Sequence, residues 1–257
     1  CMLNANGTVA YFLNPNDYTK KADGSASDIA NTSFNGNAMM QWPKIFVSRT
    51  ETGGVYKFRI CNMKLDSTFE CWSNYDQNNN EIPYFYTPIY FGSNISSKLR
   101  SLSGQANMVS QTATTEVTYA KANGTYWHTE VIADRWLLAD LCTLISKSTD
   151  CQTAFGQGRV DAGSAVATGT MNDKGLFWSG GESGVKVFGM EHPWGNLWRR
   201  QAGLILLNGA QRVKITRGTK DGSTVSDYNE TASGYLTVTN GTPAGTNGGY
   251  ISETVTM

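Results

Sequence analysis

Residues 187–200 read Val187-Phe188-Gly189-Met190-Glu191-His192-Pro193-Trp194-Gly195-Asn196-Leu197-Trp198-Arg199-Arg200. A strand-like apolar run breaks here into a turn rich in Gly, Pro and Asn, and two tryptophans stand four positions apart. Turn residues of these types specify a tight backbone, and tryptophan can bury a large apolar area. The stretch therefore predicts a closely defined loop backed by buried aromatic side chains.

Upstream of this stretch, residues 126–147 have the pattern of an amphipathic helix. Two adjacent rows of apolar residues follow helical spacing: Ala133, Leu137, Leu141 and Leu144, and Val131, Leu138, Cys142 and Ile145. So wide an apolar stripe requires a sheet or a second helix to cover it. Strand-like runs surround the helix on both sides, and they lie at 9–13, 45–47, 55–60, 84–91, 176–178, 211–216 and 235–239.

The stretch 189–198 resembles the Gly-Met-x-x-x-x-Gly-Asn-x-Trp signature of C-type-lectin-like folds of the formylglycine-generating-enzyme type. Phage tail proteins and the variable proteins of diversity-generating retroelements use that fold to display binding surfaces. The resemblance extends from about Tyr126 to the end of the chain. Two earlier strings, 14–18 and 36–44, look like the segment that precedes this domain in phage tail proteins.

This resemblance implies an α+β fold with two parts. We expect a β-rich N-terminal region at residues 1–105 and a C-type-lectin-like domain at 106–257. Because the sequence stops in a strand-like alternation, we expect that domain to be truncated at its C-terminal end.

The resemblance also implies roles for individual residues of the signature. In the family, Gly195 and Asn196 make the turn while Trp194 and Trp198 pack into the domain. The structural signature residues are thus Gly189, Met190, Gly195, Asn196 and Trp198. The candidate binding residues are Trp194, as part of a platform that stacks on sugars, and His192; the alternative for both is a structural role.

Composition narrows the classes of partner. The 257 residues include 21 Lys and Arg and 21 Asp and Glu, and 40% are hydrophobic. The chain is long enough to bury a substantial core, and its zero net charge gives no overall field to attract nucleic acid or anionic lipid. No apolar run reaches the length of a membrane-spanning helix. We therefore expect neither nucleic acid nor membrane insertion.

Patterns for catalysis and metal binding are weak. The chain has two histidines, His128 and His192, neither with a ligand partner at metal spacing, and Ser183 lacks the last glycine of a nucleophile elbow. The Asp76–Glu81 segment begins like a calcium loop but has no glycine at the turn. No cysteine follows Cys151, so the copper-dependent oxidase activity of formylglycine-generating enzymes does not carry over. We expect no catalytic residues, no metal and no cofactor.

Five cysteines leave two readings open. Cys61 with Cys71, and Cys142 with Cys151, have spacings that permit two disulfides, while Cys1 would remain. The alternative is that the cysteines are reduced thiols acting as small apolar side chains.

Taken with these observations, the resemblance implies a noncatalytic virion protein of a phage, located in a tail fibre or baseplate tip and displayed outside the particle. Its partners would be copies of itself, as a homotrimer, other virion proteins, and a glycan or protein of the host surface. One alternative is a purely structural head-fibre or decoration protein. Another is a secreted glycan-active enzyme, because two carboxylates at a suitable separation can hydrolyse a glycan. That signal has almost no specificity, since 21 acidic residues always supply some pair.

Overall fold

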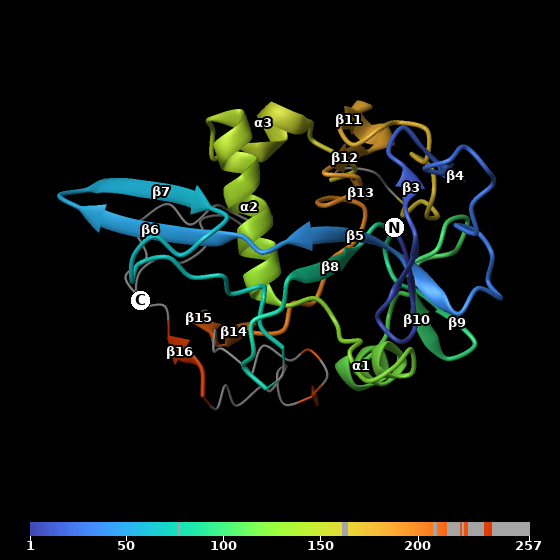
Figure 1. Cartoon of the computed structure of the whole chain (residues 1–257), viewed down its shortest axis with the longest axis horizontal. Coiled ribbons are helices and arrows are strands. Elements are labelled where there is room, and N and C mark those ends of the chain that lie inside the picture. Colours follow the sequence, from blue (N-terminus) through green and yellow to red (C-terminus); the bar gives the residue numbers. More distant parts are fainter. Residues whose placement is uncertain are drawn as a thin grey trace.

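A computed structural model describes residues 1–76, 78–160, 164–207, 210–214, 222, 224–225 and 234–237. The helices are α1 (Ala113–Lys121), α2 (Ile132–Ser146), α3 (Cys151–Phe155) and the short 3-10 helix η1 (Gly181–Ser183). The strands of the first half are β1 (Met2–Asn4), β2 (Val9–Tyr11), β3 (Leu13–Asn14), β4 (Asp17–Lys21), β5 (Gly36–Pro43), β6 (Phe46–Thr52), β7 (Val55–Cys61), β8 (Tyr84–Pro88), β9 (Ser93–Ile95) and β10 (Lys98–Arg100). The later strands are β11 (Trp178–Ser179), β12 (Val185–Val187), β13 (Met190–Glu191), β14 (Leu204–Leu207), β15 (Ala210–Val213) and β16 (Leu236–Thr237). Helices and antiparallel strands occur together, so the fold class is α+β (Figure 1).

The largest sheet has the order β2-β1-β5-β8. Its long strand β5 pairs with β1 through residues 36–38 and with β8 through residues 39–43, both antiparallel. Gly36 permits the close approach of β1, because a Cβ there would lie 2.0 Å from the Leu3 carbonyl oxygen. Strand β5 thereby links the end of the sheet that contains β1 to the end that contains β8.

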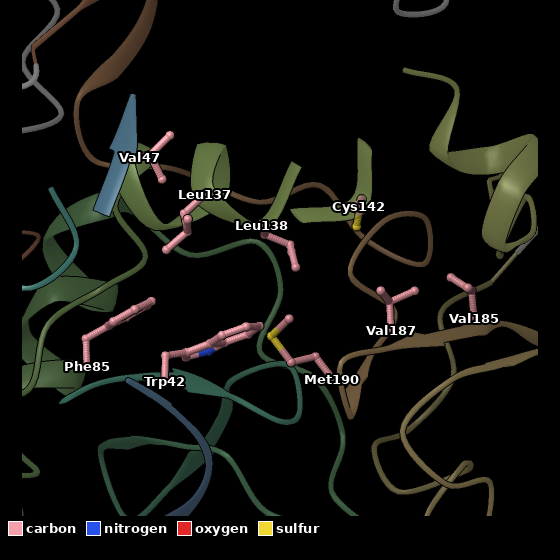
Figure 2. Close-up of a cluster of buried hydrophobic side chains, with 9 residues drawn as sticks. All are labelled: Trp42, Val47, Phe85, Leu137, Leu138, Cys142, Val185, Val187 and Met190. Carbon is pink, nitrogen blue, oxygen red and sulfur yellow. The ribbon is translucent and has the colours of Figure 1, made fainter. Parts of the chain in front are cut away.

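The main hydrophobic core lies where α2 crosses this sheet (Figure 2). Trp42 on β5 stacks on Phe85 of β8 at a ring distance of 6.0 Å, and Leu137 and Leu138 of α2 pack against them. Val185, Val187 and Met190 of the β12–β13 hairpin, Val47 and Cys142 complete the cluster. This core draws side chains from both sides of residue 105, and the domain boundary placed there stays a prediction.

A second cluster fills the space beside β1 and the first half of β5. Its buried members come from the N-terminal strands and from the segment after β8: Met2, Leu13, Tyr18, Ile29, Ala38, Ile89, Tyr90 and Leu102. The sheet is therefore covered at both ends by different segments.

Helix α2 carries the predicted apolar stripe, but it starts at Ile132 and not near Tyr126. The preceding residues form a turn in which the Trp127 amide donates to the Gly124 carbonyl, and the Trp127 indole donates to the Ala5 carbonyl at 2.8 Å. The helix ends at Ser146, and its C-cap residue Lys147 has a left-handed φ of 55°. Helix α1 was not predicted: its Thr-rich sequence has low intrinsic helix propensity, although Thr112 caps it by accepting from the Thr115 amide.

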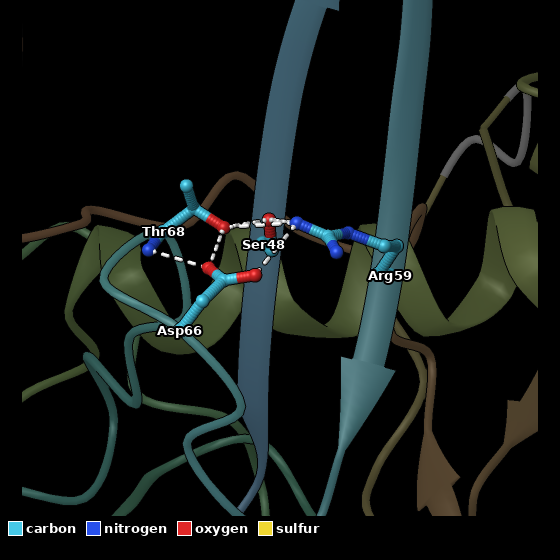
Figure 3. A network of polar contacts seen from close by, with 4 residues as sticks. All are labelled: Ser48, Arg59, Asp66 and Thr68. Carbon is cyan, nitrogen blue, oxygen red and sulfur yellow. Dashed lines mark hydrogen bonds and ion pairs between the residues drawn. The ribbon is translucent and has the colours of Figure 1, made fainter.

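The hairpin β6–β7 projects to one side of the molecule (Figure 1). It is longer than the predicted strand 45–47, and Gly53 and Gly54 turn it with φ of 61° and 76°. The Arg59 guanidinium reaches across β6 and donates to the hydroxyls of Ser48 and Thr68, each at 2.9 Å (Figure 3). This network attaches the loop after β7 to the hairpin.

The last predicted strands are described only in part. Residues 211–213 lie in β15 and residues 236–237 in β16, while 215–216 and 238–239 fall outside the described residues.

Candidate binding site

Strands β12 and β13 form a tight hairpin within the signature segment. Phe188 and Gly189 make its two-residue turn, with positive φ at both positions, and Val187 pairs with Met190. A Cβ at Gly189 would lie 2.2 Å from the Tyr18 hydroxyl, which donates to the Gly189 carbonyl at 3.1 Å. The glycine thus brings the turn against β4, and Met190, 7% exposed, enters the main core.

The hairpin carries two buried charges of opposite sign. Lys186 is fully buried and Glu191 is 2% exposed. The Glu191 carboxylate accepts the amides of Gly169 and Met171, each at 2.8 Å, while Lys186 Nζ donates to the Met171 carbonyl at 2.7 Å. Burial lowers the pKa of Lys186 to about 8 and raises that of Glu191, and each charge partly offsets the other's shift. Both side chains therefore attach the 169–171 loop to the hairpin.

His192 lies inside the protein with 2% exposure. Neither ring nitrogen has a hydrogen-bond partner among the described residues. Burial lowers the pKa of His192 to about 4, and the positive charges of Arg159 and Arg199 add to that shift. The imidazole is neutral at pH 7 and packs against Gly184, so His192 does not lie on the surface, and its role as a binding residue stays a prediction.

Gly195 and Asn196 both have positive φ, 71° and 64°, as a turn requires. A Cβ at Gly195 would lie 2.7 Å from the Arg159 amide nitrogen, and the Asn196 side chain accepts the Val166 amide at 3.0 Å. The turn is thus held against the 159–166 segment.

Trp194, just before the turn, is half-buried. Its indole donates to the Gly156 carbonyl at 2.9 Å, and its ring lies 6.3 Å from that of Phe155. These contacts join the loop to the end of α3. Only part of the ring is accessible as a sugar-stacking platform, and that role stays a prediction.

Trp198 has the opposite environment, because its side chain is 97% exposed. The prediction that Trp198 packs into the domain is therefore wrong. The reason lies in its neighbours, whose contacts direct the backbone of the loop so that the indole projects into solvent.

Arg199 is one of these neighbours and its side chain is 19% exposed. Its guanidinium lies 3.9 Å from the centre of the Phe91 ring, donates to the His192 carbonyl at 2.7 Å, and is 3.8 Å from the Glu130 carboxylate. Burial lowers the pKa of Arg199 to about 10, and Glu130 acts against that shift, so the group stays charged at pH 7. Arg135 also pairs with Glu130 and donates to the Pro193 carbonyl.

Arg200 anchors the other side of the loop. It donates to the Glu116 carboxylate of α1 at 2.6 Å. Arg199 and Arg200 thus bind the backbone after Trp198 to different parts of the fold. These contacts position the backbone on which the indole stands, so less backbone ordering is needed when the indole binds a partner.

A small pocket opens beside this loop. It lies between α2, the β5–β8 pair and residues 190–199, with apolar walls that include Trp42 and Leu141 and charged groups that include Asp134 and Arg199. Its interior of about 20 Å³ holds about one water molecule. The pocket is too small for a sugar ring, so binding in this region must use the outer surface.

Two other candidate metal-binding residues, Asp76 and His128, make contacts within the protein. The Asp76 carboxylate accepts the amides of Asn78 and Asn80 and the Asn80 side chain, and these bonds hold its loop. His128 Nδ1 contacts the Thr129 carbonyl at 2.7 Å. Within the described part of the chain, no three His, Cys, Asp or Glu residues are grouped as metal ligands would be.

The site thus differs from the predicted one in its exposed residue. Sequence reasoning assigned binding to Trp194 and His192, whereas the accessible side chain is Trp198. The two arginines after Trp198 were the signal in the sequence that could have predicted its exposure. Two cations beside an aromatic residue can fasten a loop from both sides. Sequence reasoning assigned no role to either arginine, although Arg199 makes buried contacts.

Comparison of the chain with protein-family models, with curated proteins and with solved structures finds no match. Among the described residues, no helix has the length and apolar character needed to span a membrane.

Proposed function

We propose that this protein is a noncatalytic adhesion protein of a phage virion, at a tail fibre or baseplate tip, and that Trp198 contacts the host surface. The observation that carries the proposal is the 97% exposure of this side chain on a loop held by the contacts of Arg199 and Arg200. Tryptophan is among the residues that contribute most to binding interfaces. Leaving it in water gains nothing for folding, which favours a role in recognition.

The resemblance of residues 189–198 to the C-type-lectin-like signature supports the same proposal. In that reading, the chain contains a C-type-lectin-like domain after a β-rich region, and residues 194–200 belong to a surface that the fold displays. The Gly189 and Gly195 turns with their close contacts are compatible with a rigid scaffold for such a surface.

The partner we propose is a glycan or protein of the host envelope. A flat indole face stacks on the apolar face of a sugar ring. The exposed Arg200 next to it has further N–H donors besides the one that binds Glu116, and these can donate to hydroxyl or carboxylate groups. A single such contact is weak. Several copies of the chain, together with other virion proteins, would convert weak contacts into avidity.

Binding of the fluorescently labelled full chain to a panel of intact bacterial cells and to a printed glycan array tests the proposal. Trp198→Ala should lower binding to the positive cells or glycans at least about tenfold, because an anchor residue contributes about 2 kcal/mol or more. Tyr126→Ala is the matched control, since Tyr126 is also exposed, at 71%, and its loss should leave binding unchanged.

Three results would count against this function. Equal binding by Trp198→Ala and the original chain would exclude Trp198 as the contact. Immunolabelling of intact particles on the capsid lattice instead of the tail tip would favour the alternative of a head-fibre or decoration protein. Release of sugar from envelope glycans by the purified chain would contradict the noncatalytic assignment.

A further inference from the structure

Hairpin β6–β7 is a sheet of two strands that projects from the body of the molecule (Figure 1). Each strand of such a hairpin is an edge, and its free backbone groups can pair with another chain. Near the body, the outer edge of β6 is covered: the Val47 amide donates to the Glu70 carbonyl at 2.8 Å, and the Glu70 amide donates back at 3.0 Å. Beyond Val47, no strand of the described part of the chain pairs with this edge. The distal half of β6 is therefore open to a partner strand.

The hydrogen-bond pattern identifies the free backbone groups of this open edge. In an antiparallel hairpin, successive residues of one strand point their N–H and C=O groups alternately toward the paired strand and away from it. Val47 points its groups outward, to Glu70, so Arg49 and Glu51 point theirs outward as well. These two residues supply donors and acceptors at every second position, as pairing with a further strand requires.

The side chains of the same two residues carry opposite charges. Arg49 and Glu51 lie two positions apart on β6, so both side chains stand on one face of the hairpin, the face on which Arg49 pairs with Asp140 of α2. The Arg49 side chain is 43% exposed, and Glu51 is exposed too. Charges beside an open edge hinder pairing with another strand unless that strand brings opposite charges to face them.

We propose that two copies of this chain pair through the distal half of β6, antiparallel and about a two-fold axis at Thr50. In this register Arg49 lies opposite Glu51 of the second copy, and Glu51 lies opposite its Arg49. Each pair of opposite charges coincides with a pair of residues that exchange their outward N–H and C=O groups. An axis at Arg49 or at Glu51 would instead place two like charges opposite each other. The strand is thus complementary to its own reverse in both charge and hydrogen bonding.

The same register fits the limits of the open edge. It places Val47 opposite Gly53 of the second copy, and β6 ends one residue earlier, at Thr52. The new pairing therefore stops where Glu70 begins to cover the edge. The two hairpins form one sheet of four strands in the order β7-β6-β6-β7.

The outer edge of β7 lacks this complementarity. Its charged residues, Lys57 and Arg59, are both exposed cations. A two-fold axis at Phe58, which lies between them, would place Lys57 opposite Arg59 of the second copy. Like charges of this kind protect an edge strand from self-pairing. We therefore assign the contact to β6 alone.

This contact is independent of the adhesion function. A two-fold axis generates a dimer, in place of the homotrimer that the family resemblance implies. Because the paired segment is short, the dimer should be weak and should depend on protein concentration.

Sedimentation velocity of the full chain, from about 1 μM to about 1 mM, tests the proposal. We expect a monomer–dimer equilibrium that high salt weakens. Glu51→Arg, which leaves the Arg49–Asp140 pair in place, should weaken dimerisation at least about tenfold, because two arginines then face each other in each pair. Lys57→Glu is the matched control and should leave dimerisation unchanged, since it reverses an exposed charge on the strand that is not in the contact.

A mixture of two variants distinguishes charge pairing from a general loss of structure. Arg49→Glu should also be monomeric by itself, because glutamates then face each other. An equimolar mixture of Arg49→Glu with Glu51→Arg should form a heterodimer, since every arginine of one chain faces a glutamate of the other. Circular dichroism checks that Arg49→Glu, which loses its bond to Asp140, still folds.

Hydrogen exchange of the original chain gives a measurement that needs no variant. The amides of Arg49 and Glu51 should exchange at least about tenfold more slowly in the dimer than in the monomer, because they are bonded only in the dimer. A monomer at every concentration, a trimer, or full dimerisation by Glu51→Arg would overturn the proposal. So would a mixture of two folded variants that stays monomeric, or a dimer in which these amides gain no protection.

Discussion

The two halves of residues 185–200 share one short stretch of sequence but have opposite environments. Residues 185–193 form a hairpin whose charged side chains, Lys186 and Glu191, are almost completely buried. Residues 194–200 form a loop in which the apolar Trp198 is exposed and Arg199 is mostly buried. The difference shows that partner groups, not side-chain polarity alone, determine burial: the hairpin offers amides and carbonyls to its charges, and the loop offers Trp198 no apolar cover.

Removal of Glu191 should have the largest effect on stability. Glu191→Leu leaves Lys186 buried without its counter-charge and leaves the amides of Gly169 and Met171 without their acceptor. We expect a loss of about 3 to 5 kcal/mol in the free energy of unfolding, measured by chemical denaturation. The double variant Lys186→Met/Glu191→Leu should recover part of that loss. A single variant within about 1 kcal/mol of the original would show that the pair is not what holds the hairpin.

The buried, neutral His192 should make the protein less stable in acid. Its pKa is about 4 in the folded protein against 6.5 for the free side chain, so the unfolded state binds the proton first as pH falls. The contribution of the neutral imidazole to the free energy of unfolding is complete above pH 6.5. It is lost between pH 6.5 and 4, by up to about 3 kcal/mol. His192→Asn, which tolerates the positive φ at this position, should lack this component in denaturation curves taken from pH 7 to 4. Identical pH profiles for the two proteins would contradict the burial of a neutral imidazole.

The two tryptophans should differ by about 2 kcal/mol in their effect on folding. Trp194→Ala removes a half-buried ring that packs on Phe155 and donates to Gly156, and we expect a loss of about 2 to 3 kcal/mol. Trp198→Ala removes an exposed ring and should change the unfolding free energy by less than about 0.5 kcal/mol. Chemical denaturation of both variants decides this. A larger cost for Trp198 than for Trp194 would reverse the comparison.

The smallest expected effect concerns metal. The Asp76 carboxylate already accepts two amides and the Asn80 side chain, so its loop needs no cation. Thermal melts in calcium and in chelator should superimpose. A drop of more than a few degrees in chelator would show that an ion stabilises the fold.

The sequence predicted best where local chemistry and periodicity act together. The apolar rows predicted α2 because Leu137, Leu138 and Cys142 recur at helical spacing and all meet the core. The same rows overstated its apolar face, since Leu144 and Ile145 are 50% and 54% exposed. Gly195 and Asn196 were predicted to form a turn, and residues of these types tolerate positive φ. Both residues have positive φ in the structure.

What the sequence by itself determined is the set of local preferences: the α+β character, the helical stripe and the backbone of the Gly and Asn turns. The tertiary structure alone decided which tryptophan is buried, because Trp194 and Trp198 have the same intrinsic tendency to leave water. Trp194 meets Phe155 and the Gly156 carbonyl from a distant helix, while Arg199 meets Phe91 and Glu130 and directs Trp198 outward. Burial depends on such long-range neighbours, and spacing along the chain does not contain them.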